Sequence, residues 1–293
     1  MVAAGLVAGL ATGGFPSSLT TPVEDAMLIL AMAFSLTEIS FGGLSLRTEA
    51  RGIGLALLMT YGALGGLVLA FAALSPERDL RSGWVLVAAV PPAVLIVPVT
   101  SLLRGNVRSA LIADAVLYLL GLVTVPALTV ALLGEAVPLD AIVLQTLLLI
   151  GLPILLSRPL ARWRRIHDAR PTVVSVAFFF LVLAIAGSAR AVLLGRPDLL
   201  AGLFALALLR TFGLGLLILA AANAFRLDRA TRVATATFGG FKNLGLTVVL
   251  ASAVFGPVAS LPAIACLIFE TAWLMTLPFL FRTSPRGVAE IPE

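Results

Sequence analysis

Ten apolar segments separated by short polar loops fill almost the whole chain and leave no stretch long enough for a soluble domain. The 293-residue chain is 60% hydrophobic and 12% charged, whereas a soluble domain carries roughly 25% charged residues. Because a membrane-crossing helix needs about 20 apolar residues, the pattern predicts an all-α integral membrane protein with ten transmembrane helices. The segments run over 1–15, 23–44, 52–74, 83–103, 109–133, 140–157, 172–189, 199–221, 231–254 and 259–281.

The arginines lie almost entirely in the loops and predict the orientation of these segments. With the N-terminus inside, 14 arginines fall in inner regions and 4 in outer loops, while Arg210 and Lys242 lie within segments and complete the 20 basic residues. Positive charge gathers on the cytoplasmic side of membrane proteins. We therefore expect a multi-pass protein of the cell (inner) membrane with both termini in the cytoplasm. The basic charge is explained by topology in the lipid bilayer, so we expect no nucleic-acid partner.

The segments divide into two groups of five, residues 1–135 and 136–293. An odd number of spans gives the two halves opposite orientations, as an inverted repeat requires. The fourth segment of each half is interrupted, by Val-Pro-Pro at 90–92 and by Phe-Gly-Gly at 238–240. Paired interruptions in matching segments indicate a substrate site at the bilayer midplane of a transporter. The alternative is a pair of ordinary kinks, since Gly and Pro are common in membrane helices.

The single lysine of the chain, Lys242, follows the second interruption inside an apolar segment. An ionisable side chain at membrane depth costs about 2.5–3.5 kcal/mol on insertion scales and is retained where it faces a cavity or a partner. Lys242 therefore marks a candidate functional site. With one cysteine and one histidine in the chain, neither a Cys/His metal site nor a Ser-His-Asp triad can be assembled in the membrane. We expect no cofactor, no metal and no enzymatic activity.

Two stretches carry recognisable motifs. In residues 88–120, Thr-Ser-Leu-Leu-Arg-Gly-Asn closes the fourth segment, and in residues 238–263 an apolar run ends in Phe-Gly-Pro. These stretches resemble the fourth and ninth helices of the bile acid:sodium symporter family, and with the ten-segment layout the resemblance covers nearly the whole chain. The matching positions are Thr100, Leu102, Arg104, Gly105 and Asn106 in the first stretch and Gly240, Asn243, Phe255, Gly256 and Pro257 in the second.

The resemblance implies a core domain and a panel domain. Residues 52–133 and 199–281 would form the core, in which the two broken helices cross. Residues 1–44 and 140–189 would form the panel. Substrate would bind in the crevice between the two domains, and the core would move against the panel.

The sodium site of the family is not preserved in this chain. Sodium requires a shell of neutral and anionic oxygens, so we expect no sodium site of the family type. The positions that the resemblance assigns to sodium ligands read Ile96, Val97, Ala110, Asp114, Phe238 and Lys242 here.

Asp114 and Lys242 occupy positions that the resemblance assigns to one ion site. A buried carboxylate and ammonium a few Å apart lower each other's desolvation penalty and titrate as a coupled pair. Lysine also shifts its pKa readily on burial and can exchange a proton. The ammonium would thus replace a sodium ion, similar to the Asp–Lys arrangement of electrogenic sodium/proton antiporters, which is a likeness of architecture only.

Arg210 and Glu270 lie deep in the eighth and tenth segments. We expect a core ion pair between them. The alternative for Arg210 is binding of a substrate anion, since a guanidinium matches a carboxylate in bidentate geometry.

Four further residues near the interruptions are candidates for substrate binding. Asn243 either donates to a substrate carboxylate or satisfies unwound backbone. Thr100 either binds substrate or bonds back to its own helix, and the second interpretation is favoured. Pro92 and Gly240 complete the set, because they lie in the interruptions themselves.

These observations favour a sodium-independent secondary transporter of a small organic anion, either uncoupled or coupled to protons through Asp114 and Lys242. An alternative with the same architecture is a transporter similar to auxin efflux carriers. From another class, a non-transporting receptor or subunit locked by an Asp114–Lys242 pair is also consistent with the sequence. An intramembrane enzyme is the least favoured interpretation.

Overall fold

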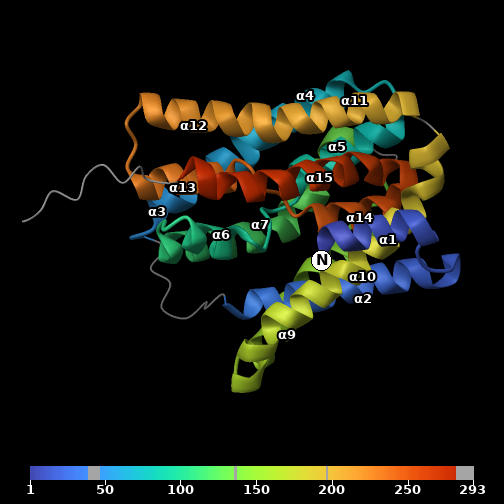
Figure 1. Cartoon of the computed structure of the whole chain (residues 1–293), viewed down its shortest axis with the longest axis horizontal. Helices are drawn as coiled ribbons and strands as arrows, with labels where there is room; N and C mark the ends of the chain where they lie inside the picture. Colours follow the sequence, from blue (N-terminus) through green and yellow to red (C-terminus); the bar gives the residue numbers. More distant parts are fainter. Residues whose placement is uncertain (39–46, 135–136, 196, 282–293) are drawn as a thin grey trace, which may run out of the picture.

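The computed structural model describes residues 1–38, 47–134, 137–195 and 197–281, and every regular element in these ranges is helical (Figure 1). Six of the described helices are long and apolar enough to cross a membrane. A further apolar helix, Leu244–Phe255, is shorter. The predicted all-α membrane class is therefore confirmed. The six are Ala50–Leu74, Val107–Leu133, Leu139–Leu160, Asp168–Ala191, Leu199–Ala224 and Pro257–Leu280.

The other expected spans are not single long apolar helices. Helix α1 (Val2–Thr12) has 11 residues, which rise about 16 Å, and it ends where Gly13 takes a φ of 82°. Helix α2 (Ser17–Ser35) is longer but carries Glu24 and Asp25. The fourth and ninth segments are each divided by a break, so their halves fall below the length of a complete crossing.

The first break separates α5 (Arg78–Ala89) from α6 (Ile96–Leu102). Proline has no amide hydrogen to donate, and it drives the residue before it out of the α conformation. Val90, which precedes Pro91 and Pro92, accordingly has a ψ of 153°. The helix therefore stops at the predicted interruption.

The second break separates α13 (Arg229–Phe238) from α14 (Leu244–Phe255). A side chain at Gly240 would bring its Cβ to 2.7 Å from the Ala236 carbonyl oxygen and 3.0 Å from Trp273 Nε1. The close approach of these neighbours therefore requires glycine. The two breaks meet, because Pro92 and Lys242 form an isolated antiparallel bridge and the Asn243 amide donates to the Pro91 carbonyl at 3.0 Å.

Three described long spans contain a π-helical turn at mid-length. In one, η2 (Leu58–Leu64) joins α3 (Ala50–Leu57) to α4 (Gly65–Leu74). In another, η4 (Leu209–Gly213) joins α11 (Pro197–Leu208) to α12 (Leu214–Ala224). In the third, η3 (Leu147–Gly151) joins α8 (Leu139–Thr146) to α9 (Leu152–Leu160). Such turns occur often at functional sites. The remaining elements are η1 (Leu36–Glu38), α7 (Val107–Leu133), α10 (Arg164–Gly195) and α15 (Pro257–Leu280).

The helices pack in two groups that meet beside the breaks. Helices α1 and α2 pack on α10, and α2 also packs on α9, at the lower right of Figure 1. In the other group α5 is central and packs on α4, α7, α14 and α15. Helices α2 and α10 contact α14, which joins the groups. The first group corresponds to the segments expected to form the panel, of which residues 39–44 lie outside the described residues.

Asp228 caps the start of α13, and replacing it with alanine should destabilise the protein. Its carboxylate accepts hydrogen bonds from the Thr231 amide at 3.1 Å and the Thr231 hydroxyl at 2.6 Å. Loss of such a cap costs about 1 kcal/mol. We expect Asp228→Ala to lower the free energy of unfolding in detergent micelles by about that amount at pH 7.

The effect of this cap should depend on pH. The hydrogen bonds from Thr231 lower the pKa of the Asp228 carboxyl, so its contribution is complete above the unfolded pKa of about 3.9 and is lost as the pH falls through the folded pKa. Unfolding curves of wild type and Asp228→Ala should therefore differ by a constant amount above about pH 4 and converge as the pH falls from there to about pH 2. A difference that stays constant over this range would contradict the assignment.

Candidate functional site at the crossing of the broken helices

The ammonium of Lys242 lies at the end of half-helix α5. Its side chain is 1% exposed, and Nζ donates to the carbonyl oxygens of Ala88 at 2.7 Å and Val90 at 2.8 Å. The last carbonyls of a helix have no partner within the helix, and that end carries partial negative charge. Lys242 therefore caps α5 across the crossing, with a positive charge where the helix dipole favours one.

An aromatic ring completes the surroundings of this ammonium. Lys242 Nζ lies 4.4 Å from the centroid of the Tyr61 ring, which belongs to the π-turn η2. The face of an aromatic ring attracts a cation. Tyr61 Oη is in turn 3.2 Å from Thr124 Oγ1, which lies 3.4 Å from the Ala89 carbonyl oxygen. The carbonyl oxygens at the end of α5 thus accept hydrogen bonds from Lys242 and Thr124, which belong to two other spans.

Glu270 and Arg210 form an ion pair behind the second break. Arg210 Nη1 donates to Glu270 Oε1 at 2.5 Å, and both side chains are buried. The same carboxylate oxygen accepts the backbone amide of Lys242 at 3.1 Å. The pair expected from the sequence is therefore present, and it fixes the unwound backbone of the second break. Glu270 contacts one of the guanidinium nitrogens, while Nε and Nη2 have no hydrogen-bond partner among the described residues. Because the side chain is fully buried, this conformation does not present Arg210 to a substrate.

Asn243 joins the second break to α7 and to α2. Its Oδ1 accepts the Leu246 amide at 3.1 Å and so caps α14. Its Nδ2 donates to Tyr118 Oη at 3.0 Å and lies 3.7 Å from Met32 Sδ. Of the two interpretations of Asn243, the structure thus contains the one in which the side chain satisfies backbone.

Asp114 does not form an ion pair with Lys242 in this structure. It is 1% exposed on α7, one turn before Tyr118. Its Oδ1 has no hydrogen-bond partner among the described residues. The carboxylate that contacts the second break is instead that of Glu270, which accepts the Lys242 backbone amide. The Lys242 ammonium instead meets the carbonyls of α5 and the Tyr61 ring.

Thr100 lies apart from the crossing. Together with Asn106 and Ser109 it lines a separate cavity of about 420 Å³ at the other end of α6. Its hydroxyl has no hydrogen-bond partner among the described residues, so the back-bond favoured from the sequence is not made. Of the residues proposed for substrate binding, the crossing brings together Pro92, Gly240 and Asn243 but not Thr100.

A crevice lies between the two helix groups beside the first break. It encloses about 250 Å³ and is lined by Val94, Leu95 and Pro98 on one side and by Arg170 and Phe178 of α10 on the other. Ser35 of α2 also lines it. Ser35 is one helical turn from Met32, the contact of Asn243. The crevice is therefore adjacent to the crossing.

Several residues of this site were not identified from the sequence. The chain has two tyrosines, and both Tyr61 and Tyr118 contact the site. Their rarity was the available signal, as it was for the single lysine. Arg170 was counted only as a topological charge, although it lines the crevice.

Comparison with known proteins identifies a family. The model of the SBF-like CPA transporter family matches residues 32–284, which include both breaks and every residue of the crossing. The resemblance to bile acid:sodium symporters is thereby confirmed. A search of curated proteins finds no match.

The Arg210–Glu270 pair should couple strongly in stability. Removing one partner of a buried pair leaves an uncompensated charge and costs about 3–5 kcal/mol. We expect Arg210→Gln and Glu270→Gln each to reduce the free energy of unfolding by this order, and the double variant to cost clearly less than the sum. Unfolding in detergent micelles measures the cycle.

A surface pair provides the control for this cycle. Arg108, whose side chain is 69% exposed, lies 3.9 Å from Glu49. Arg108→Gln should change stability by less than about 0.5 kcal/mol. Additive losses for Arg210 and Glu270 would show that the pair contributes no coupling.

Proposed function

The chain belongs to the SBF-like CPA transporter family, and from this membership we propose that it carries a small organic anion by alternating access, independently of sodium. As a member with multiple apolar helices, it is a multi-pass membrane transporter. The observation that carries the finer proposal is the Lys242 ammonium held at the crossing by two carbonyls and one ring.

Sodium independence is supported by the charge already present at the crossing. The carbonyls that could face a cation at the end of α5 are occupied by Lys242. A second unit charge 4 Å away would be repelled by about 4 kcal/mol at an effective dielectric constant of 20. The tethered ammonium thus replaces a bound sodium ion and cannot be released with the substrate.

A small anion is supported by the crevice. Its volume of about 250 Å³ is below the roughly 300–1,000 Å³ of sites for drug-sized ligands. Arg170 supplies the cationic group and Phe178 and Val94 supply apolar walls. We propose that the substrate carboxylate meets Arg170, with Asn243, Pro92 and Gly240 lining the deeper part of the path when the helix groups separate.

Proton coupling is proposed to run through Asp114 and Lys242. The two groups are buried on different elements, α7 and the second break. Asp114 Oδ1 has no partner among the described residues, so a movement that takes Lys242 from the α5 carbonyls can bring it to this carboxyl. Exchange of partners during the cycle would link proton movement to the change of access.

The architecture that we propose has ten spans in two inverted repeats of five. The support is the correspondence of elements between the halves, namely a span with a central π-turn followed by a broken helix and then a long helix. In this proposal the group around α10 is the panel and the group around α5 is the core. Both termini face the cytoplasm.

Sodium and pH should separate this proposal from the ordinary sodium mechanism of related families. In proteoliposomes assayed from pH 5 to 9, we expect transport current and thermal stability of wild type to respond to pH and to remain the same when sodium replaces choline. Lys242→Gln should lose the pH response. Strong stabilisation of wild type by sodium would overturn sodium independence, and absence of both current and pH response would favour a non-transporting receptor.

Arg170→Gln should impair anion transport without unfolding the protein. With labelled acetate, pyruvate and benzoate as probes, we expect uptake of the transported probe to fall about ten-fold or more, as for loss of a hydrogen bond to a charged group. Arg162→Gln, an exposed change in the preceding turn, is the matched control and should retain uptake. Equal uptake by the two variants would remove Arg170 from the substrate path.

A further inference from the structure

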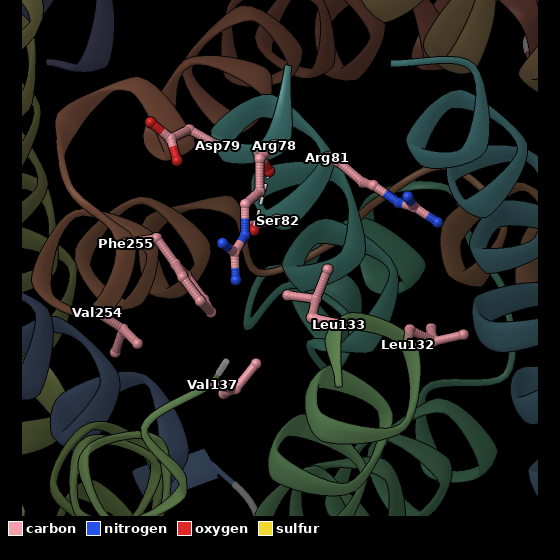
Figure 2. A pocket seen from close by; sticks show the side chains of 9 residues that line it. All are labelled: Arg78, Asp79, Arg81, Ser82, Leu132, Leu133, Val137, Val254 and Phe255. Atoms are coloured by element: carbon pink, nitrogen blue, oxygen red, sulfur yellow. Dashed lines mark hydrogen bonds between the residues drawn. The ribbon is translucent and has the colours of Figure 1, made fainter. Parts of the chain in front are cut away.

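A second cavity, of about 550 Å³, lies at the end of α5 opposite to the crossing (Figure 2). Helix α5 has 12 residues and so is about 18 Å long. The first turn of α5 forms one wall, and the C-terminal ends of α7 and α14 form the others. No residue that lines this cavity also lines the crevice beside Arg170.

The Arg78 side chain is directed into the cavity. In Figure 2 the Arg78 guanidinium extends between Phe255 and Leu133, whereas the Asp79 carboxylate points away from the centre. Arg81 also lines the cavity, but its guanidinium extends away from Arg78 toward the rim. Neither guanidinium forms a hydrogen bond or an ion pair with a described residue. Two cationic groups therefore remain available to a ligand.

The start of α5 adds further donors. The first amides of a helix have no partner within the helix and attract anions. Glu77 precedes α5 but its side chain makes no capping hydrogen bond to these amides. Ser82, which also lines the cavity, donates its hydroxyl to the Arg78 carbonyl at 3.0 Å and so supports the backbone of this turn.

The opposite walls are apolar. Leu132 and Leu133 end α7, Val254 and Phe255 end α14, and Val137 lies between α7 and α8. An inorganic anion would use the arginines alone and leave these walls in contact with water. A hydrocarbon chain would cover them and remove apolar surface from water.

We propose that this cavity binds an anionic headgroup, carboxylate or phosphate, carried on a hydrocarbon chain. The headgroup accepts hydrogen bonds from Arg78, Arg81 adds positive charge at the rim, and the chain packs on Phe255, Val254 and Leu133. Two sources share this chemistry, an anionic lipid of the surrounding bilayer and a soluble amphipathic carboxylate. Val137 lies between α7 and α8, so the occupant also contacts the connection between these two helices. The site does not depend on the proposed transport function.

Binding to the purified full-length protein in detergent, followed by native mass spectrometry, tests this site. The anionic probes are dihexanoyl phosphatidylglycerol and decanoate, and their counterparts without net charge are the zwitterionic dihexanoyl phosphatidylcholine and the neutral decanol. We expect one anionic molecule per protein and affinity about ten-fold or more above the counterpart. Tighter binding of phosphatidylglycerol than of decanoate assigns the site to lipid, and the reverse order assigns it to a soluble carboxylate.

Variants locate the binding. Arg78→Gln combined with Arg81→Gln should weaken binding of the anionic probe about ten-fold or more, and Phe255→Ala should weaken the chain-bearing probes but not inorganic phosphate. Arg190→Gln, a change at another arginine far along the sequence, is the matched control and should bind as wild type. Arg78 and Arg81 are exposed, whereas Phe255 is partly buried and packs on the core. Thermal melting verifies that each variant is folded. Equal binding by the double arginine variant, equal binding of the neutral counterparts, or no binding of either anionic probe would overturn the proposal.

Discussion

The contact between the Lys242 ammonium and the end of α5 is the interaction on which the crossing depends. Two half-helices that stop inside a membrane leave carbonyls without partners, and no water in the bilayer core can satisfy them. Lys242 donates to Ala88 and Val90 and so satisfies one half-helix with a side chain from the other break. The same contact accommodates a charge that would otherwise be costly at this depth. The two costs offset each other, which explains how one lysine can be retained in an apolar chain.

The second break is stabilised differently, and the difference gives the site its asymmetry. Glu270 accepts the Lys242 amide and the Arg210 guanidinium, while Asn243 caps α14 and reaches Tyr118. The backbone of this break is therefore fixed, whereas the Lys242 side chain is held by neutral acceptors and a ring. Neutral acceptors bind an ammonium less strongly than a carboxylate does. The arrangement thus separates Arg210, Glu270 and Asn243, which hold the backbone of the break, from one charged group whose described partners are all neutral.

Much of this arrangement followed from the sequence, because its signals were local. Adjacent prolines, paired glycines and a charge in an apolar segment each have a direct physical meaning, and the two breaks and the Arg210–Glu270 pair lie where these signals indicate. Contacts between distant segments were harder to predict. The expected meeting of Asp114 with Lys242 depended on an alignment of motifs, and the structure turns the ammonium to backbone carbonyls, which carry no residue-specific signal. Tyr61 was missed for the same reason, since its position depends on a π-turn that composition does not reveal.

Those π-turns make chain length a determinant of the site. Each residue of an α-helix advances the direction of the side chains by about 100°, so a widened turn contains in effect one residue more than a regular helix needs. The turns η2 and η4 hold Tyr61 and Arg210, and each is followed by a further helix, α4 or α12. Removing a single residue from either turn would restore regular winding and rotate one end of the span relative to the other. The side chains of that end would point about 100° away from their present directions, even though every remaining residue was unchanged. In these two spans, the position of the site therefore depends on the number of residues as well as on their side chains.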